Sequence, residues 1–100
     1  MNLIVDSGST KTDWICIDSK NNRIFETQTL GLNPQVLDAN IINERVINNY
    51  DLYQNRKKIT CLYFYGAGCG TQSPKRLIEK VFESIFINSK YQSQKIFFVN

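Results

Sequence analysis

The opening third of the chain shows three short runs of β-forming residues separated by polar turns. The first run is apolar and ends at an aspartate, the second is rich in branched and aromatic residues, and the third alternates apolar and polar positions. These runs predict strands at Asn2–Val5, Asp13–Asp18 and Arg23–Leu30, with a polar turn over 6–12. Because the connections are short, we expect the three strands to form an antiparallel meander.

The middle of the chain predicts one helix followed by a buried strand. Over residues 36–50, apolar side chains recur at the spacing of one helix face. Asn33 could cap this helix, with Pro34 at its first position. A polar connection is expected at 51–58. The nearly continuous apolar segment Ile59–Tyr65 then predicts a strand that is buried on both faces.

A glycine-rich turn and a second helix come next. Ser73 suits the N-cap of that helix with Pro74 at its first position, and the apolar residues behind them recur four apart. Lys95–Val99 predicts a last strand. The resulting order is βββαβαβ, which favours an α/β domain with a mixed sheet, helices packed on it and right-handed connections. The later strands are expected to run parallel to the first.

Composition and charge narrow the function classes. One hundred residues, 42% of them hydrophobic, suit one small domain. The net charge is +3, and the basic triplet at 56–58 is too small for a nucleic-acid footprint. No apolar run approaches a membrane span and no secretory leader is recognisable, so a cytoplasmic protein without membrane or nucleic-acid partners is expected. Three unclustered cysteines indicate reduced thiols. Histidine is absent, which excludes His-dependent triads and His-bearing zinc sites within the chain.

The segment from Asp6 to Asp13 carries the clearest chemistry. A carboxylate closes the first strand, and the six residues after it are one glycine, four hydroxyls and a lysine. A tight turn of this kind can present N–H groups as an anion-binding nest, with hydroxyls and Lys11 adding donors, while Asp6 could hold the water shell of Mg²⁺. A plain Ser/Thr-rich hairpin is the alternative, and a Walker A loop is excluded because its motif is absent. The predicted cofactor-binding residues are Asp6, Ser7, Gly8, Ser9, Thr10, Lys11 and Thr12.

The second glycine turn offers a weaker signal. Gly66-Ala67-Gly68 follows a strand and precedes a helix, as a dinucleotide-binding fingerprint would, but Thr71 stands where the third glycine is required. We interpret the turn as a place where substrate approaches the backbone. A plain strand-to-helix connection is the equal alternative.

Three segments together resemble a known family: D-S-G-S-T-K-T-D-W (6–14), G-L-N-P (31–34) and F-Y-G-A-G-C (64–69). They are similar to the BadF/BadG/BcrA/BcrD ATPase family, and within it to the bacterial N-acetylglucosamine kinase-like branch. The resemblance spans essentially the whole chain and keeps the order and spacing of the motifs. It implies an actin-like ATPase fold of the actin/hexokinase/Hsp70 type, in which two ribonuclease H-like domains close on Mg·ATP.

The resemblance also implies roles for individual residues. Asp6 would lie near Mg²⁺, residues 8–11 would surround the β- and γ-phosphates of ATP, and Asn33 would contact the sugar. The residues bordering the same cleft would be Gly66, Ala67 and Gly68. In the family, the Asp that activates the acceptor hydroxyl follows the strand that matches 96–99, which places it beyond Asn100. We therefore expect a truncated N-terminal lobe that is inactive by itself.

The implied function is ATP-dependent phosphorylation of an amino sugar such as N-acetylglucosamine by the complete protein, which could act as a homodimer. Two other classes stay open. One is an ATP-driven activator that passes an electron to a dehydratase or reductase partner. The other is a non-catalytic, nucleotide-sensing module that keeps the fold without turnover.

Overall fold

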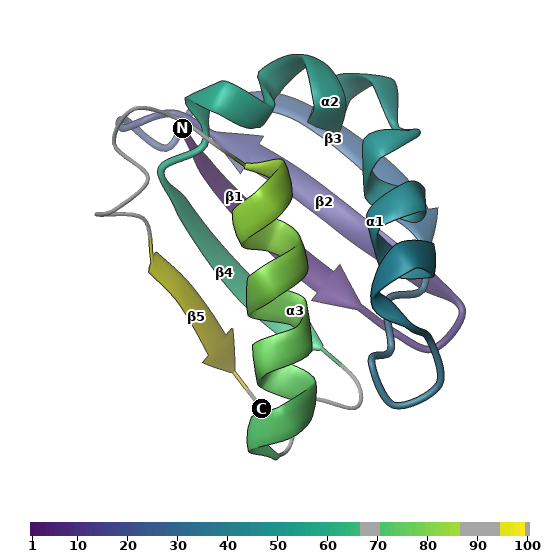
Figure 1. Ribbon diagram of the computed structural model, residues 1–100. Coiled ribbons are helices and arrows are strands. Elements are labelled where there is room, and N and C mark those ends of the chain that lie inside the picture. Colours follow the sequence, from purple (N-terminus) through teal and green to yellow (C-terminus); the bar gives the residue numbers. More distant parts are fainter. Residues whose placement is uncertain (67–70, 87–94, 100) are drawn as a thin grey trace.

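The strands form one mixed sheet. The computed structural model describes residues 1–66, 71–86 and 95–99. Within these residues, five strands lie in the order β3-β2-β1-β4-β5 (Figure 1). Strand β2 is antiparallel to both of its neighbours, whereas β1, β4 and β5 run parallel. The predicted antiparallel meander and mixed α/β sheet are thus confirmed. The strand bounds are β1 Asn2–Ser7, β2 Lys11–Ile17, β3 Arg23–Leu30, β4 Cys61–Gly66 and β5 Lys95–Val99.

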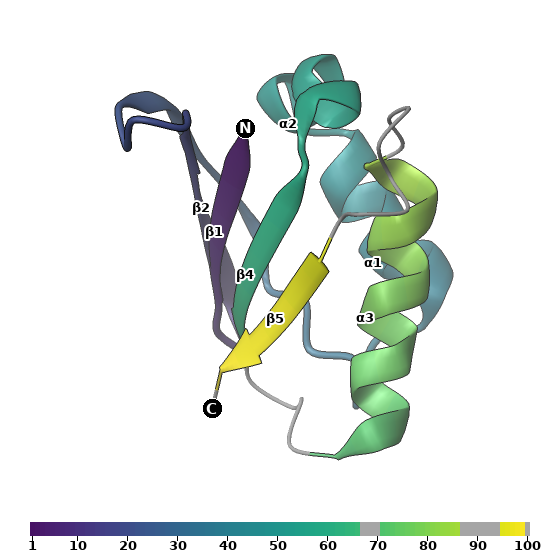
Figure 2. The same ribbon diagram turned by 90° about the vertical axis from the view of Figure 1, so that its left-hand side faces the viewer.

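Helices lie on one face of this sheet, as Figure 2 shows for α1 and α3. The short helix α2 continues from α1 toward the start of β4. Among the residues described, no helix is long and apolar enough to cross a membrane. The helix bounds are α1 Ala39–Ile47, α2 Tyr50–Asn55, the 3₁₀ helix η1 Arg56–Lys58, and α3 Gln72–Ile85.

The core lies between the sheet and these helices, and aromatic rings fill its centre. Side chains alternate between the two faces of a strand, which turns Trp14 of β2 and Phe64 of β4 toward the helices. The ring centroid of Phe82 in α3 lies 5.8 Å from that of Trp14 and 5.6 Å from that of Phe64. Phe86 completes the cluster, 5.7 Å from Phe82. All four rings are fully buried. Their burial holds α3 against β2 and β4.

The turn between β1 and β2 is shorter than the sequence predicts. Strand β1 continues through Asp6 and Ser7, and β2 begins at Lys11, so only residues 8–10 lie outside the strands. Ser7 is paired with Thr12 in the register of the two strands. Both side chains are buried and hydrogen-bonded to each other. Polar residues can continue a buried ladder when their hydroxyls satisfy one another.

The predicted single helix over 36–50 is wrong, because two side-chain caps divide the segment. The Asp38 carboxylate accepts the N–H of Ile41 at 2.9 Å and begins α1. The Asn49 side-chain oxygen accepts the N–H of Leu52 at 3.0 Å and begins α2. Asp and Asn side chains bond nearby backbone groups outside helices, and therefore favour helix starts over helix interiors.

Three other boundaries differ from the expectations. The segment 51–58, predicted as a polar connection, is mostly helical. Strand β4 begins two residues later than predicted, at Cys61. Helix α3 begins at Gln72 with Thr71 at its N-cap position, so Ser73 is not the cap. The Thr71 side chain forms no capping bond, so α3 begins without a side-chain cap.

The turn between β2 and β3 predicts an acid-shifted carboxyl group. Asp18 Oδ1 accepts the N–H groups of Asn22 and Lys20, each at 2.9 Å. These bonds, that of Asn22 foremost, lower the pKa of Asp18 from its ordinary value. The stabilisation is therefore present above the unfolded pKa and is lost as pH falls through the folded pKa. Carbon-13 NMR should show Asp18 titrating at lower pH in the folded chain than in an unstructured peptide of residues 16–24. Equal titration in both would contradict the turn geometry.

Candidate functional site

The exposed turn between β1 and β2 is the centre of the candidate site. The Gly8 N–H donates to the carbonyl of Lys11 at 2.9 Å and closes a loop made of Ser9 and Thr10. Both loop side chains are exposed. Within the described part of the chain, their backbone N–H groups form no hydrogen bond. Two N–H groups and two hydroxyls are therefore available to an anion.

Gly8 is not required by the conformation of this turn. Its φ lies outside the left-handed region, and a Cβ built there would meet the Lys11 carbonyl oxygen at 3.5 Å, an ordinary contact. What the glycine does provide is a backbone without a side chain, which a ligand can approach closely.

The structure divides the predicted cofactor-binding residues into an exposed and a buried group. Ser7 and Thr12 are only 3% and 0% exposed, and their hydroxyl oxygens lie 2.9 Å apart. Ser7 also accepts the N–H of Leu32, and Thr12 donates to the carbonyl of Leu30, both at 3.1 Å. In this arrangement the two hydroxyls support the turn from beneath and do not reach a ligand. The exposed group comprises Asp6, Gly8, Ser9, Thr10 and Lys11.

A polar recess of about 290 Å³ lies beside the turn. Asp6 faces Asp13 across the β1–β2 pair, and Gln28 Nε2 donates to Asp13 Oδ1 at 2.6 Å. Like charges directly opposite each other on a sheet repel, so a cation near the two carboxylates would relieve this repulsion. The recess is lined by Asp6, Gly8, Ser9, Thr10, Lys11 and Asp13.

Asp13 is a site residue that the sequence reasoning missed. A two-residue loop at Ser9 and Thr10 pairs position 6 with position 13 on the same face of the sheet. That register follows only if the loop is short, whereas the polarity of residues 6–12 predicts one long turn. The signal was therefore present in the spacing, but it was obscured by the polarity of buried strand residues.

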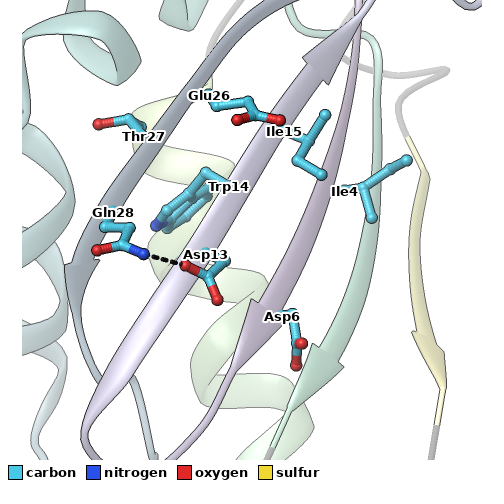
Figure 3. Close-up of a pocket in the computed structure, with 8 residues that line it drawn as sticks. All are labelled: Ile4, Asp6, Asp13, Trp14, Ile15, Glu26, Thr27 and Gln28. Atoms are coloured by element: carbon cyan, nitrogen blue, oxygen red, sulfur yellow. Dashed lines mark hydrogen bonds between the residues drawn. The ribbon is translucent and has the colours of Figure 1, made fainter.

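The recess continues along the face of the sheet opposite the helices (Figure 3). A second hollow of about 540 Å³ shares Asp6 and Asp13 with the first. Ile4 and Ile15, which are cross-strand neighbours, form its apolar part, and Glu26 lies along its β3 side. A ligand held at the turn could therefore extend over an apolar floor with polar edges. The hollow is lined by Ile4, Asp6, Asp13, Ile15, Glu26 and Gln28, and also by Trp14 and Thr27, whose side chains contact groups on the helix side of the sheet.

The segment that leads to Asn33 lies directly against the turn, as its place in Figure 1 indicates. The Gly31 N–H donates to the carbonyl of Thr10 at 2.9 Å. A Cβ built on Gly31 would lie 2.5 Å from the Ser9 carbonyl oxygen and 2.7 Å from that of Gly8. Only a residue without a side chain permits this approach. Asn33 follows this contact by two residues along the chain.

Asn33 forms a local turn and caps no helix. Its side-chain oxygen accepts the N–H of Gln35 at 2.9 Å, and its carbonyl accepts the N–H groups of Val36 and Leu37. The interpretation of Asn33 as a helix cap is wrong, because α1 begins at Ala39. The half-buried Asn33 side chain has an amide N–H₂ group that donates to none of the described residues, so this group is available to a ligand.

The second glycine turn is described only at its first residue. Gly66 ends β4, whereas Ala67 and Gly68 lie outside the described residues. A Cβ on Gly66 would overlap the buried ring of Phe64. Packing against Phe64 therefore requires glycine at position 66, whether or not a substrate approaches it.

Two comparisons with known proteins identify no relative of this chain. A scan against protein-family models finds no match for the chain, and a search of the curated proteins finds none either.

Proposed function

We propose that this chain is the phosphate-binding lobe of an ATP-dependent sugar kinase with a ribonuclease H-like, actin-like ATPase fold. The observation that carries the proposal is the contact between the exposed turn, Gly8–Lys11, and the segment that leads to Asn33. A kinase must hold a phosphoryl donor and an acceptor hydroxyl side by side. The sheet order β3-β2-β1-β4-β5, in which an antiparallel meander is followed by parallel strands joined through helices, supports the ribonuclease H-like assignment.

The turn would hold the phosphates of ATP through backbone and side-chain donors. The free N–H groups and hydroxyls of Ser9 and Thr10 offer four donors on two adjacent residues. Lys11 is exposed at the start of β2 and adds a positive charge. The open backbone at Gly8 leaves room for phosphate oxygens beside the loop.

The two carboxylates fit a Mg²⁺ ion that accompanies the phosphates. Within the described ranges, no group of three or more metal-ligating side chains comes together. Mg²⁺ suits such a sparse site, because it keeps several waters and takes one or two carboxylates together with substrate phosphates. We assign Asp6 as the residue that holds it, through water, with Asp13 opposite. When bound, the ion would neutralise charge on the phosphates.

The acceptor side of the site is assigned to Asn33. Its free N–H₂ group can donate to a sugar hydroxyl or to an acetamido carbonyl. The proposed acceptor is accordingly N-acetylglucosamine or a related amino sugar. Phosphoryl transfer requires little covalent chemistry from the protein, because positioning and charge neutralisation provide most of the rate. No residue of this chain is assigned as the base that accepts the hydroxyl proton.

Removal of the Asp6 carboxylate tests the proposal. In the complete protein that carries this chain, kcat/KM for transfer from Mg·ATP to N-acetylglucosamine should fall on the order of 100-fold in Asp6→Ala, the effect typical of losing one preorganised electrostatic contact. Asp51→Ala removes an exposed carboxylate from α2, away from the recess, and should leave the rate nearly unchanged. Undiminished transfer in Asp6→Ala would refute the metal role.

Two other measurements distinguish the alternative functions. ATP binding without transfer to any sugar of a hexose panel would favour the nucleotide-sensing module. An iron–sulfur absorbance in anaerobically purified protein would favour the activator.

Gly8→Ala should separate ligand binding from folding. A Cβ at this position fits the folded backbone, so the free energy of unfolding should rise slightly, by about 0.4–1 kcal/mol, because alanine restricts the unfolded chain. The same methyl group would occupy the space of a phosphate oxygen. Calorimetry should therefore show Mg·ATP binding weakened on the order of tenfold, or 1.4 kcal/mol. Unchanged affinity would contradict a close approach of phosphate at Gly8.

A further inference from the structure

We propose that Ser7 and Thr12 are positioning residues. Their buried hydroxyls hold the phosphate turn, Gly8–Lys11, in a fixed geometry relative to residues 30–33, here called the Asn33 segment. The inference rests on the function proposed above, because it concerns how the donor and acceptor sides of that site are aligned. It also gives a role to two side chains that are too deeply buried to serve as phosphate ligands.

The direction of each hydrogen bond in this network can be assigned from the number of donors. Each hydroxyl donates one hydrogen bond. Thr12 donates to the carbonyl of Leu30, so Ser7 must donate across the 2.9 Å contact to Thr12. Ser7 then accepts the N–H of Leu32. The chain of bonds therefore begins and ends on the segment 30–32, and it passes through the last residue of β1 and the second residue of β2.

Burial makes this network stiff. Ser7 and Thr12 are almost without solvent contact, so water does not replace a lost partner. Loss of either hydroxyl would leave a buried donor or acceptor unpaired, which is the costly outcome for a polar group inside a protein. Successive hydrogen bonds of this kind also polarise one another.

A second set of contacts ties the same two segments together from the side. The Gly31 N–H donates to the Thr10 carbonyl, and Arg45 Nη1 of α1 donates to the Gly31 carbonyl at 2.5 Å. The turn is thus fixed to the segment at Thr10 as well as at its base. A phosphate that orders the turn must then also order Leu32, and by linkage the coupling acts equally in both directions.

Amide hydrogen exchange of the complete protein tests this coupling, with Mg-tripolyphosphate as the probe. In the wild type, the probe should slow exchange at Leu32 on the order of tenfold, although Leu32 does not belong to the turn. Ser7→Ala should speed Leu32 exchange in the free protein and remove the slowing by the probe. Thr12→Ser keeps a hydroxyl and should behave as the wild type. Ser84→Ala is the matched control, since it deletes a hydroxyl that bonds the Val81 carbonyl in α3, far from the turn.

Kinetics provide a readout that a merely structural role would not move. With Mg·ATP and N-acetylglucosamine, Ser7→Ala should lower kcat on the order of tenfold while KM for ATP stays nearly unchanged. The single variant Thr12→Ser, which keeps a hydroxyl, should have the kcat and the KM for ATP of the wild type. If Ser7→Ala instead lowers activity only in proportion to its unfolded fraction, the positioning role is overturned.

The remaining outcomes separate this inference from the proposed function. Tripolyphosphate that binds the wild type without slowing Leu32 exchange overturns the inference and leaves the phosphate site standing. Absence of any binding to the wild type overturns the proposed function and the positioning role with it. The wild-type comparison needs no variant, so it decides the question even if Ser7→Ala does not fold.

Discussion

Replacement of Trp14 by alanine should lower the free energy of unfolding by about 3–5 kcal/mol, the range for a large aromatic residue in a core. The ring is fully buried and lies 5.8 Å and 6.3 Å, centroid to centroid, from Phe82 and Phe86. The indole Nε1 donates to Thr29 Oγ1 at 3.0 Å. Alanine would therefore leave a cavity at the contact between β2 and α3 and remove a hydrogen bond between β2 and β3. Urea denaturation followed by far-ultraviolet circular dichroism measures the loss.

Two variants control this measurement. Trp14→Phe keeps a ring in the cluster and loses the indole N–H, so its destabilisation should be clearly smaller. Tyr50→Ala removes an aromatic side chain that is 66% exposed, and its effect should stay within about 0.5 kcal/mol. If Trp14→Ala were no more destabilising than Tyr50→Ala, the packing of α3 on the sheet would be contradicted.

Gly31→Ala is expected to destabilise the chain by about 1–3 kcal/mol, as insertion of a methyl group into a filled space does. The obstructing atoms are the backbone carbonyls of Ser9 and Gly8, at 2.5 Å and 2.7 Å from the new Cβ. Because backbone atoms cannot rotate away as a side chain would, either the turn or the Asn33 segment must shift. In the complete protein, KM for the sugar should therefore rise as well.

Gly8→Ala is the matched control for that change. It adds the same methyl group to the turn that Gly31 contacts, but at a position where the nearest atom lies 3.5 Å away, an ordinary contact distance. Urea denaturation of the two variants should thus give effects of opposite sign. Equal stabilities would show that the turn and the segment do not lie in contact as described.

Strand β3 could be predicted from the sequence because its side chains alternate regularly between the two faces of the sheet. Strand β5 could be predicted because its short run is rich in β-forming residues. The predicted bounds of β3 and β5 agree with those in the structure, Arg23–Leu30 and Lys95–Val99. Alternation is imposed by a sheet that packs on one face, and it therefore survives without knowledge of the tertiary structure.

The division of the helical segment could not be predicted from apolar spacing. Asp38 and Asn49 act through single hydrogen bonds to the backbone, and a search for apolar periodicity gives these bonds no weight. The interior of the candidate site was obscure for a related reason. A serine that bonds a buried threonine and a serine that faces solvent look the same in a sequence. The sequence therefore predicts one role for Ser7 and Ser9, although Ser7 is buried and Ser9 is exposed.

The burial of Trp14 also gives the protein a natural optical probe. It is the only tryptophan in the chain, and its indole lies among apolar rings with its N–H bonded to a hydroxyl. Its fluorescence should consequently be emitted at the short wavelengths of a nonpolar environment and shift to longer wavelengths when α3 separates from the sheet. Because Trp14 and Thr12 belong to the same strand, this emission would report, without an added label, whether β2 beneath the candidate site is folded.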